Sequence, residues 1–234
     1  MKKLLSITLI FVLCFAFASC GAAKRDESYK RSTNDETTQE IVTQPEQTEV
    51  YEVTTNKDTK NYPKVEIKVK KYGTIKLQLD SVQAPETVKN FVSLVKKGFY
   101  DGLTFHRIIS NFMIQGGDPN GNGSGGNVVN GQEVNVKGEF SLNGVNNTIS
   151  HKKGVISMAR SNSGYDTASS QFFICNADAS ASLDGQYAAF GYVYEGIEVV
   201  DKITNEVAPK ATDTNGTIQA SDQPVIKSIK VIEE

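Results

Sequence analysis

The chain has 234 residues, enough for one sizeable domain with accessory segments but too few for two large domains. Its formal net charge is -2, so composition argues against nucleic acid as a partner. Hydrophobic residues make up 38% of the chain, a usual fraction for a soluble globular domain.

The N-terminal residues differ in composition from the rest. Two lysines precede an apolar run over residues 4–17, which is too short to span a membrane and predicts a signal peptide over residues 1–19. The four residues ending at Cys20 resemble a bacterial lipobox, with Phe17 in place of the usual leucine. This resemblance implies lipidation of Cys20. An ordinary signal peptide cut near Ala18 is the alternative.

The remaining cysteines and the next segment agree with a lipid anchor. Cys14 would leave with the signal peptide, so Cys175 alone would remain and no internal disulfide is expected. Residues 20–62 are polar and acidic, which predicts a disordered tether because such a segment buries too little apolar surface to offset its ordering entropy. We predict a domain over residues 63–234 held at the outer face of the cell membrane by the lipid anchor only.

The first predicted elements of the domain are a hairpin and a helix. Apolar and polar residues alternate over 64–70 and over 75–79 on either side of a glycine turn, which predicts an antiparallel hairpin with one buried face. A helix is predicted from near Pro85 to Gly98, because apolar residues recur between them at i, i+3, i+4 and i+7.

The rest of the domain consists mainly of short apolar runs separated by Gly, Asn and Asp. These runs lie at residues 105–109, 112–115, 154–159, 171–175 and 187–193. A second short helix is predicted around Val199, and a closing strand over 224–232. Many short strands with two helices predict an all-β fold that closes into an antiparallel barrel. No heptad pattern is present, so we expect a monomer.

Five motifs identify a family by their order and spacing. They are FHRII at 105–109, FMIQGGD at 112–118, GVISMA at 154–159, SQFFIC at 170–175 and LDGQY at 183–187. Together they closely resemble the cyclophilin family of peptidyl-prolyl cis-trans isomerases, over residues 65–234. The resemblance implies a closed eight-stranded barrel capped by two helices, with a proline-binding groove on its outer face.

The resemblance also implies roles for individual residues. Arg107 matches the catalytic arginine of the family. Nine positions match the substrate groove: Phe112, Met113, Phe173 and Leu183 for the proline pocket, Gln115 and Gln171 for polar groups lining the groove, Ala159 and Arg160 for a strand edge that pairs with the substrate, and Tyr187 where bacterial members often have Tyr. Without the family register, alternation alone leaves Phe112, Met113 and Phe173 equally consistent with core positions.

The implied reaction requires no cofactor. Rotation about a peptide C–N bond has a barrier of about 18–20 kcal/mol, because the nitrogen lone pair is delocalised. In the twisted transition state the nitrogen can accept a hydrogen bond, so a fixed guanidinium such as that of Arg107 would bind this state better than the planar substrate. No proton transfer and no metal is needed. We therefore expect proline-containing polypeptides as the partners.

Other chemical motifs are incomplete. Residues 118–129 begin like a calcium loop, but Val129 stands where a bidentate Glu is required, and the same stretch lacks the Lys-Ser/Thr of a P-loop. A hydrolase triad of Ser169 or Ser170 with His151 and Asp166 lacks a surrounding Gly-x-Ser-x-Gly. His106 and His151 have no partner at ligand spacing, and we expect structural roles and no metal.

Two alternative functions stay open, and the sequence departs from the family pattern at one position. A surface module that binds proline-containing segments without turnover is the main alternative, and a general holdase for secreted proteins is the third. The chain contains no Trp, and Ser182 stands where cyclosporin-sensitive members have one. We therefore predict weak inhibition by cyclosporin.

Overall fold

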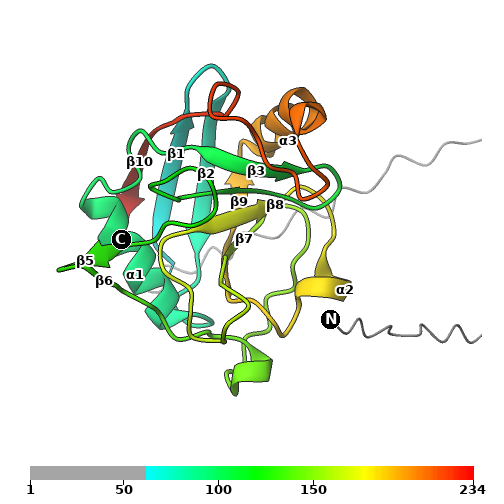
Figure 1. The fold of residues 1–234 in the computed structure, drawn as a ribbon. Helices are drawn as coiled ribbons and strands as arrows, with labels where there is room; N and C mark the ends of the chain where they lie inside the picture. The colour runs from blue at the N-terminus through cyan, green and yellow to red at the C-terminus, as the bar shows by residue number, and fades with distance from the viewer. Residues whose placement is uncertain (1–61) are drawn as a thin grey trace, which may run out of the picture. The chain divides into compact units, whose positions relative to one another are not determined.

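The computed structural model describes residues 62–234 (Figure 1). The predicted signal peptide, Cys20 and all but the last residue of the predicted tether lie outside the described residues. Eight strands form one antiparallel sheet: β1 (Lys64–Val69), β2 (Gly73–Leu79), β3 (Phe105–Ile109), β4 (Met113–Gly116), β7 (Val155–Met158), β8 (Phe172–Cys175), β9 (Ala189–Glu195) and β10 (Ile226–Glu233). Their order in the sheet is β10-β1-β2-β9-β7-β8-β4-β3. β5 (Val128–Val129) and β6 (Gln132–Glu133) form a separate small hairpin.

The sheet curls but stays open, so the structure does not support the predicted closed barrel. Within residues 62–234 no strand ladder joins the edge strands β3 and β10. An isolated bridge between Thr104 and Val225 and a hydrogen bond from the Gly102 N–H to the Ile226 carbonyl at 2.9 Å connect the chain at their beginnings. The physical reason is that another segment occupies the free edge of β3. The Ile108 N–H donates to the Gly216 carbonyl at 2.8 Å, and the Ile218 N–H donates to the His106 carbonyl at 2.9 Å.

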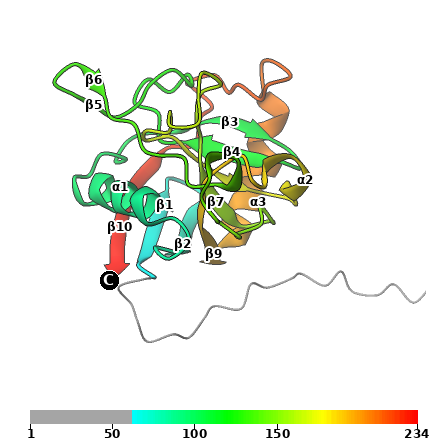
Figure 2. The same cartoon turned by 90° about the horizontal axis from the view of Figure 1, so that it is seen from below.

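Both predicted helices are present, and α1 (Pro85–Lys96) and α3 (Ile197–Val207) lie at opposite sides of the curled sheet (Figures 1 and 2). A buried carboxylate completes the start of α1, because Glu139 accepts the backbone N–H groups of Glu86 and Thr87 at 3.0 and 2.8 Å. The short helix α2 (Ser180–Leu183) and the 3-10 turns η2 (Ser141–Asn143) and η3 (Ala208–Lys210) were not predicted.

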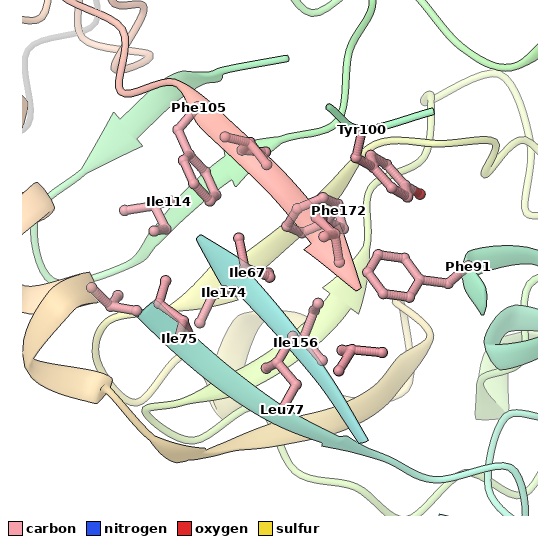
Figure 3. Close-up of a cluster of buried hydrophobic side chains, with 14 of the residues drawn as sticks. Ile67, Ile75, Leu77, Phe91, Tyr100, Phe105, Ile114, Ile156, Phe172 and Ile174 are labelled. Atoms are coloured by element: carbon pink, nitrogen blue, oxygen red, sulfur yellow. The ribbon is translucent and has the colours of Figure 1, made fainter. Parts of the chain in front are cut away.

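The main core fills the inside of the curl. Figure 3 shows Ile67 and Leu77 from the first hairpin together with Phe91 from α1 and Phe172 from β8. The rings of Phe91 and Phe172 meet edge to face, with centroids 5.5 Å apart. The buried faces of the predicted hairpin and helix therefore contribute to one core.

Across residues 62–234, no helix combines the length and the apolar character that a membrane crossing requires.

Candidate active site

A second apolar cluster lies on the outer face of the sheet. Side chains alternate between the two faces of a strand, and along β8 Phe172 enters the main core while Phe173 joins this outer cluster. In the same way, β4 directs Ile114 inward and Met113 outward. The alternation therefore gives two neighbouring strands apolar side chains on the outer face of the sheet.

A cavity of about 390 Å³ opens on this outer face. Nine of the ten residues predicted to act in catalysis or substrate binding line it: Arg107, Phe112, Met113, Gln115, Ala159, Arg160, Phe173, Leu183 and Tyr187. The tenth, Gln171, lies beside it, since the Gln115 side-chain amide donates to the Gln171 side-chain oxygen at 2.8 Å. The structure thus brings the whole predicted set together.

Arg107 stands at the polar side of the cavity on β3. It pairs directly across the ladder with Gln115 on β4, and its Nη1 donates to the Gln115 side-chain oxygen at 3.0 Å. Its Nε donates to the carbonyl of Asn215 at 2.7 Å. A guanidinium carries five N–H donors in a fixed plane, so these two bonds orient the plane while other donors can meet a ligand.

The positive charge of Arg107 is available to a ligand. Among residues 62–234 the recorded ion pairs include none to Arg107. Burial lowers the pKa of Arg107 from its ordinary value, and the nearby Tyr187 and Asp213 groups oppose this shift. An arginine remains charged under such conditions. The site therefore holds a partly desolvated cation beside an apolar wall.

The apolar wall is formed mainly by buried side chains. Met113, Phe173 and Leu183 are 1%, 4% and 5% exposed, and the Tyr187 ring meets Phe173 edge to face at 5.9 Å. Phe112 is half-buried at the rim. Such a pocket accepts a small apolar group and excludes water from it.

Asn176 fixes the turn that presents Phe112, and the sequence did not point to it. Its side-chain oxygen accepts the Phe112 N–H at 2.7 Å, and its amide donates to the Ile109 carbonyl at 2.9 Å. Asn111 between these two residues has a positive φ of 57°, a conformation that Asn tolerates better than most residues. Asn176 therefore holds β3, the turn and the pocket rim in register.

A buried hydrogen-bonded chain supports the pocket from behind. His151 Nδ1 lies 2.8 Å from Asp184 Oδ1, and His151 Nε2 lies 3.0 Å from Ser157 Oγ. The His151 ring stacks on Phe173 with centroids 6.1 Å apart. Since His151 and Ser157 are 1% and 0% exposed, Ser157 cannot reach a substrate as a nucleophile. The chain instead joins the end of α2 to strands β7 and β8.

The protonation of this chain follows from its partners. Ionised Asp184 can only accept, so Nδ1 of His151 carries the proton and Nε2 accepts from the Ser157 hydroxyl. Burial lowers the pKa of His151, and the hydrogen bond to Asp184 opposes that shift. Neutral His151 is thus the form that the fold selects. The sequence-based expectation of a structural role agrees with this position, but its partners were not predicted.

His106 also lines the cavity and was predicted to be structural. Its side chain is 3% exposed, and within the described residues neither ring nitrogen has a hydrogen-bond partner. Burial lowers the pKa of His106, with nearby Asp118 acting in the opposite direction. Neutral imidazole is therefore favoured here as well.

A second cavity of about 270 Å³ continues from the first. The two share Gln115, Gly123, Ala159 and Arg160 in their linings. Arg160 is fixed between them, because its Nε donates to the Gln186 carbonyl at 3.0 Å and its guanidinium lies 4.7 Å from the centre of the Tyr187 ring. The two cavities together form one groove, which we call the outer groove.

The loop that resembles a calcium site is occupied by its own hydrogen bonds. The Asp118 carboxylate accepts the backbone N–H groups of Asn120 and Asn122 at 2.8 and 3.0 Å. Within residues 62–234, no group of three His, Cys, Asp or Glu side chains is placed to hold a metal ion.

Sequence comparison identifies the class of protein to which this fold and groove belong. Residues 64–231 match the family model described as "Cyclophilin type peptidyl-prolyl cis-trans isomerase/CLD". The chain belongs to this family.

Curated relatives and a solved structure agree. A peptidyl-prolyl cis-trans isomerase of Helicobacter pylori is 45% identical over 133 residues, which cover 56% of this chain and 74% of the relative. One from Acinetobacter baylyi is 39% identical over 167 residues, covering 68% of this chain and 79% of the relative. A cyclophilin-type isomerase of Cryptosporidium parvum, crystallised in the presence of the dipeptide Ala-Pro, is 31% identical with a TM-score of 0.61 and covers 73% of this chain and 99% of that one. The chain is thus an enzyme of this class.

Proposed function

We propose that this isomerase accelerates X–Pro rotation in proteins that fold outside the cytoplasmic membrane, with Arg107 as its central catalytic residue. One observation carries the role of Arg107: its guanidinium is held by Gln115 at the edge of an apolar pocket, with donors left to face a ligand. The Ala-Pro dipeptide used with the related Cryptosporidium parvum enzyme supports proline-containing substrates.

The mechanism follows from a difference between two states of the substrate. In the planar ground state the imide nitrogen is a poor acceptor, and in the twisted state its lone pair is available. A guanidinium donor fixed beside the proline ring therefore lowers the barrier without binding the ground state more tightly. An acceleration of about 10⁵ requires about 7 kcal/mol. The proline ring would occupy the wall of Met113, Phe173 and Leu183, where exclusion of water strengthens the bond to Arg107.

The extracytoplasmic location rests on the sequence. The predicted signal peptide over residues 1–19 and the lipobox-like segment ending at Cys20 support a lipid anchor, and the polar tether supports a domain held away from the membrane. Incorporation of labelled fatty acid by the full chain in a bacterial host tests this. Cys20→Ser should abolish labelling, while Cys14→Ser should retain it. A mature N-terminus at Ser19 without label would favour the ordinary signal peptide.

The main alternative is a surface module that binds proline-containing segments and does not turn them over. Pure binding does not require a guanidinium at the twisting bond, so the placement of Arg107 favours catalysis. An isomerisation assay on a short X–Pro peptide separates the two, because a binding module would retain peptide affinity at an unchanged rate of rotation. A holdase would instead bind unfolded chains irrespective of proline.

A further inference from the structure

The β5–β6 hairpin exposes aliphatic side chains that the fold does not need. Val128, Val129 and Val134 are 58%, 48% and 38% exposed, and none belongs to either apolar cluster. Figure 2 shows the hairpin projecting from the rest of the domain. Valine favours strands, and an aliphatic side chain exposed on a projecting element beside a groove is available to a bound polypeptide.

The hairpin is held rigidly at its base. Ser169, which is 5% exposed, accepts the Asn127 N–H at 2.9 Å and donates its hydroxyl proton to the Val134 carbonyl at 2.9 Å. At the tip, Asn130 and Gly131 have φ angles of 52° and 78°, which suit the Asn-Gly turn of a two-residue hairpin loop. The position of the exposed valines is therefore defined by the fold.

Only one of the three valines is on the face of the hairpin that meets the outer groove. Val128 pairs across the hairpin with Glu133, and Val129 pairs with Gln132. Cross-strand partners share a face and successive residues alternate. Since Glu133 lines the second cavity, Val128 lies on the groove side, while Val129 and Val134 lie on the opposite face.

The groove leads from the proline pocket to this face. The second cavity shares four lining residues with the first, and Glu133 of the hairpin is part of its lining. A hydrogen-bonded series also connects the two ends: Arg107 donates to Gln115, Gln115 donates to Gln171, and Gln171 donates to the Gly125 carbonyl at 2.8 Å. An extended polypeptide with its proline beside Arg107 can continue along this path to the hairpin.

We propose that Val128 binds an aliphatic side chain of the client polypeptide, located several residues from the isomerised proline. This inference rests on the proposed substrate role of the outer groove. The contact extends recognition beyond the residues next to proline and favours clients with an aliphatic residue at one defined spacing. Four extended residues span at most about 13–14 Å, so a proline tetrapeptide serves as the substrate on which the contact should have no effect.

Two single variants of the full chain test the contact. Val128→Ser alters the groove face, and Val129→Ser is the matched control, with the same residue type on the opposite face of the same hairpin. The substrates are a four-residue X–Pro peptide and a series of longer peptides that carry one leucine at successive positions, two to eight residues before or after proline, in an otherwise Gly/Ser background.

The two variants should behave differently on the longer peptides. We expect one leucine position to raise kcat/KM for the wild type, and Val128→Ser to lower kcat/KM on that peptide about fivefold. Val129→Ser should leave this value unchanged. On the four-residue peptide, kcat/KM should be the same for all three proteins. A fivefold loss corresponds to about 1 kcal/mol at 1.4 kcal/mol per tenfold.

Two results would overturn the proposal while leaving isomerase activity intact: no leucine position that responds to Val128→Ser, or equal losses in both variants. Failure of the wild type to act on the four-residue peptide would instead contradict the proposed function itself.

Discussion

Replacing His151 with leucine should destabilise the domain through the loss of a buried hydrogen-bond partner. The Ser157 hydroxyl lies on β7 with 0% exposure, and its recorded side-chain bond is to His151 Nε2 at 3.0 Å. Leucine is of similar size and removes that acceptor, which leaves a buried hydroxyl unsatisfied at a cost of about 1–3 kcal/mol. The lost bond to Asp184 adds little, because the Asp184 side chain is 39% exposed and water can replace the imidazole.

We therefore expect His151→Leu to lower the free energy of unfolding by about 1–3 kcal/mol. Urea denaturation of the full chain, followed by tyrosine fluorescence, measures it. The double variant His151→Leu/Ser157→Ala removes the stranded hydroxyl and should recover about 1 kcal/mol relative to His151→Leu alone.

The same variant should affect substrate binding. His151 stacks on Phe173, and its partner Asp184 directly follows Leu183, so two sides of the proline pocket lose support. KM for a short X–Pro peptide should rise more than kcat falls, because Arg107 is untouched. The reasoning would be refuted by a loss of stability below about 0.5 kcal/mol, or by a double variant less stable than His151→Leu.

Two further predictions concern pH and inhibitor binding. Burial lowers the pKa values of His106 and His151 in the folded state, so the unfolded chain binds more protons than the folded chain below about pH 6.5. The free energy of unfolding should therefore fall from about pH 7 to about pH 5. His106→Gln and His151→Gln should each flatten the dependence of the urea midpoint on pH. Cyclosporin should inhibit weakly, because exposed Ser182 provides neither the aromatic surface nor the indole donor of a tryptophan. Ser182→Trp should tighten inhibition about tenfold in a peptide assay. Sub-micromolar inhibition of the wild type would contradict this prediction.

Sequence patterns predicted the longer elements and missed the shortest ones. The alternation of β1 and β2 and the helical spacing in α1 were sufficient to place these elements. α2 has only four residues and β5 and β6 two each, which is too short for any period to emerge. Closure of the barrel was predicted incorrectly, because no local pattern showed that the segment around Gly216 would pair with the free edge of β3.

The site was predicted from motif order rather than from local chemistry. Alternation along β4 and β8 left Met113 and Phe173 ambiguous between core and pocket, and the curl of the sheet places both on the outer face. The Asp184–His151–Ser157 chain could not be read from the sequence, because Asp184 is 33 residues from its histidine. Asn176 likewise acts on Phe112 from 64 residues away.

The most direct test of the central claim compares wild type, Arg107→Lys and Arg107→Ala of the full chain in the isomerisation of a short X–Pro peptide, with peptide affinity measured in parallel. Lysine keeps the charge but lacks the planar fork that Gln115 and the Asn215 carbonyl orient. We predict strong acceleration by the wild type and incomplete rescue by lysine. In Arg107→Ala the turnover rate should fall by about 100-fold or more, the size expected for the loss of one preorganised donor. Equal acceleration by all three proteins would contradict the role of Arg107, and retained peptide binding without acceleration in the wild type would identify a binding module instead.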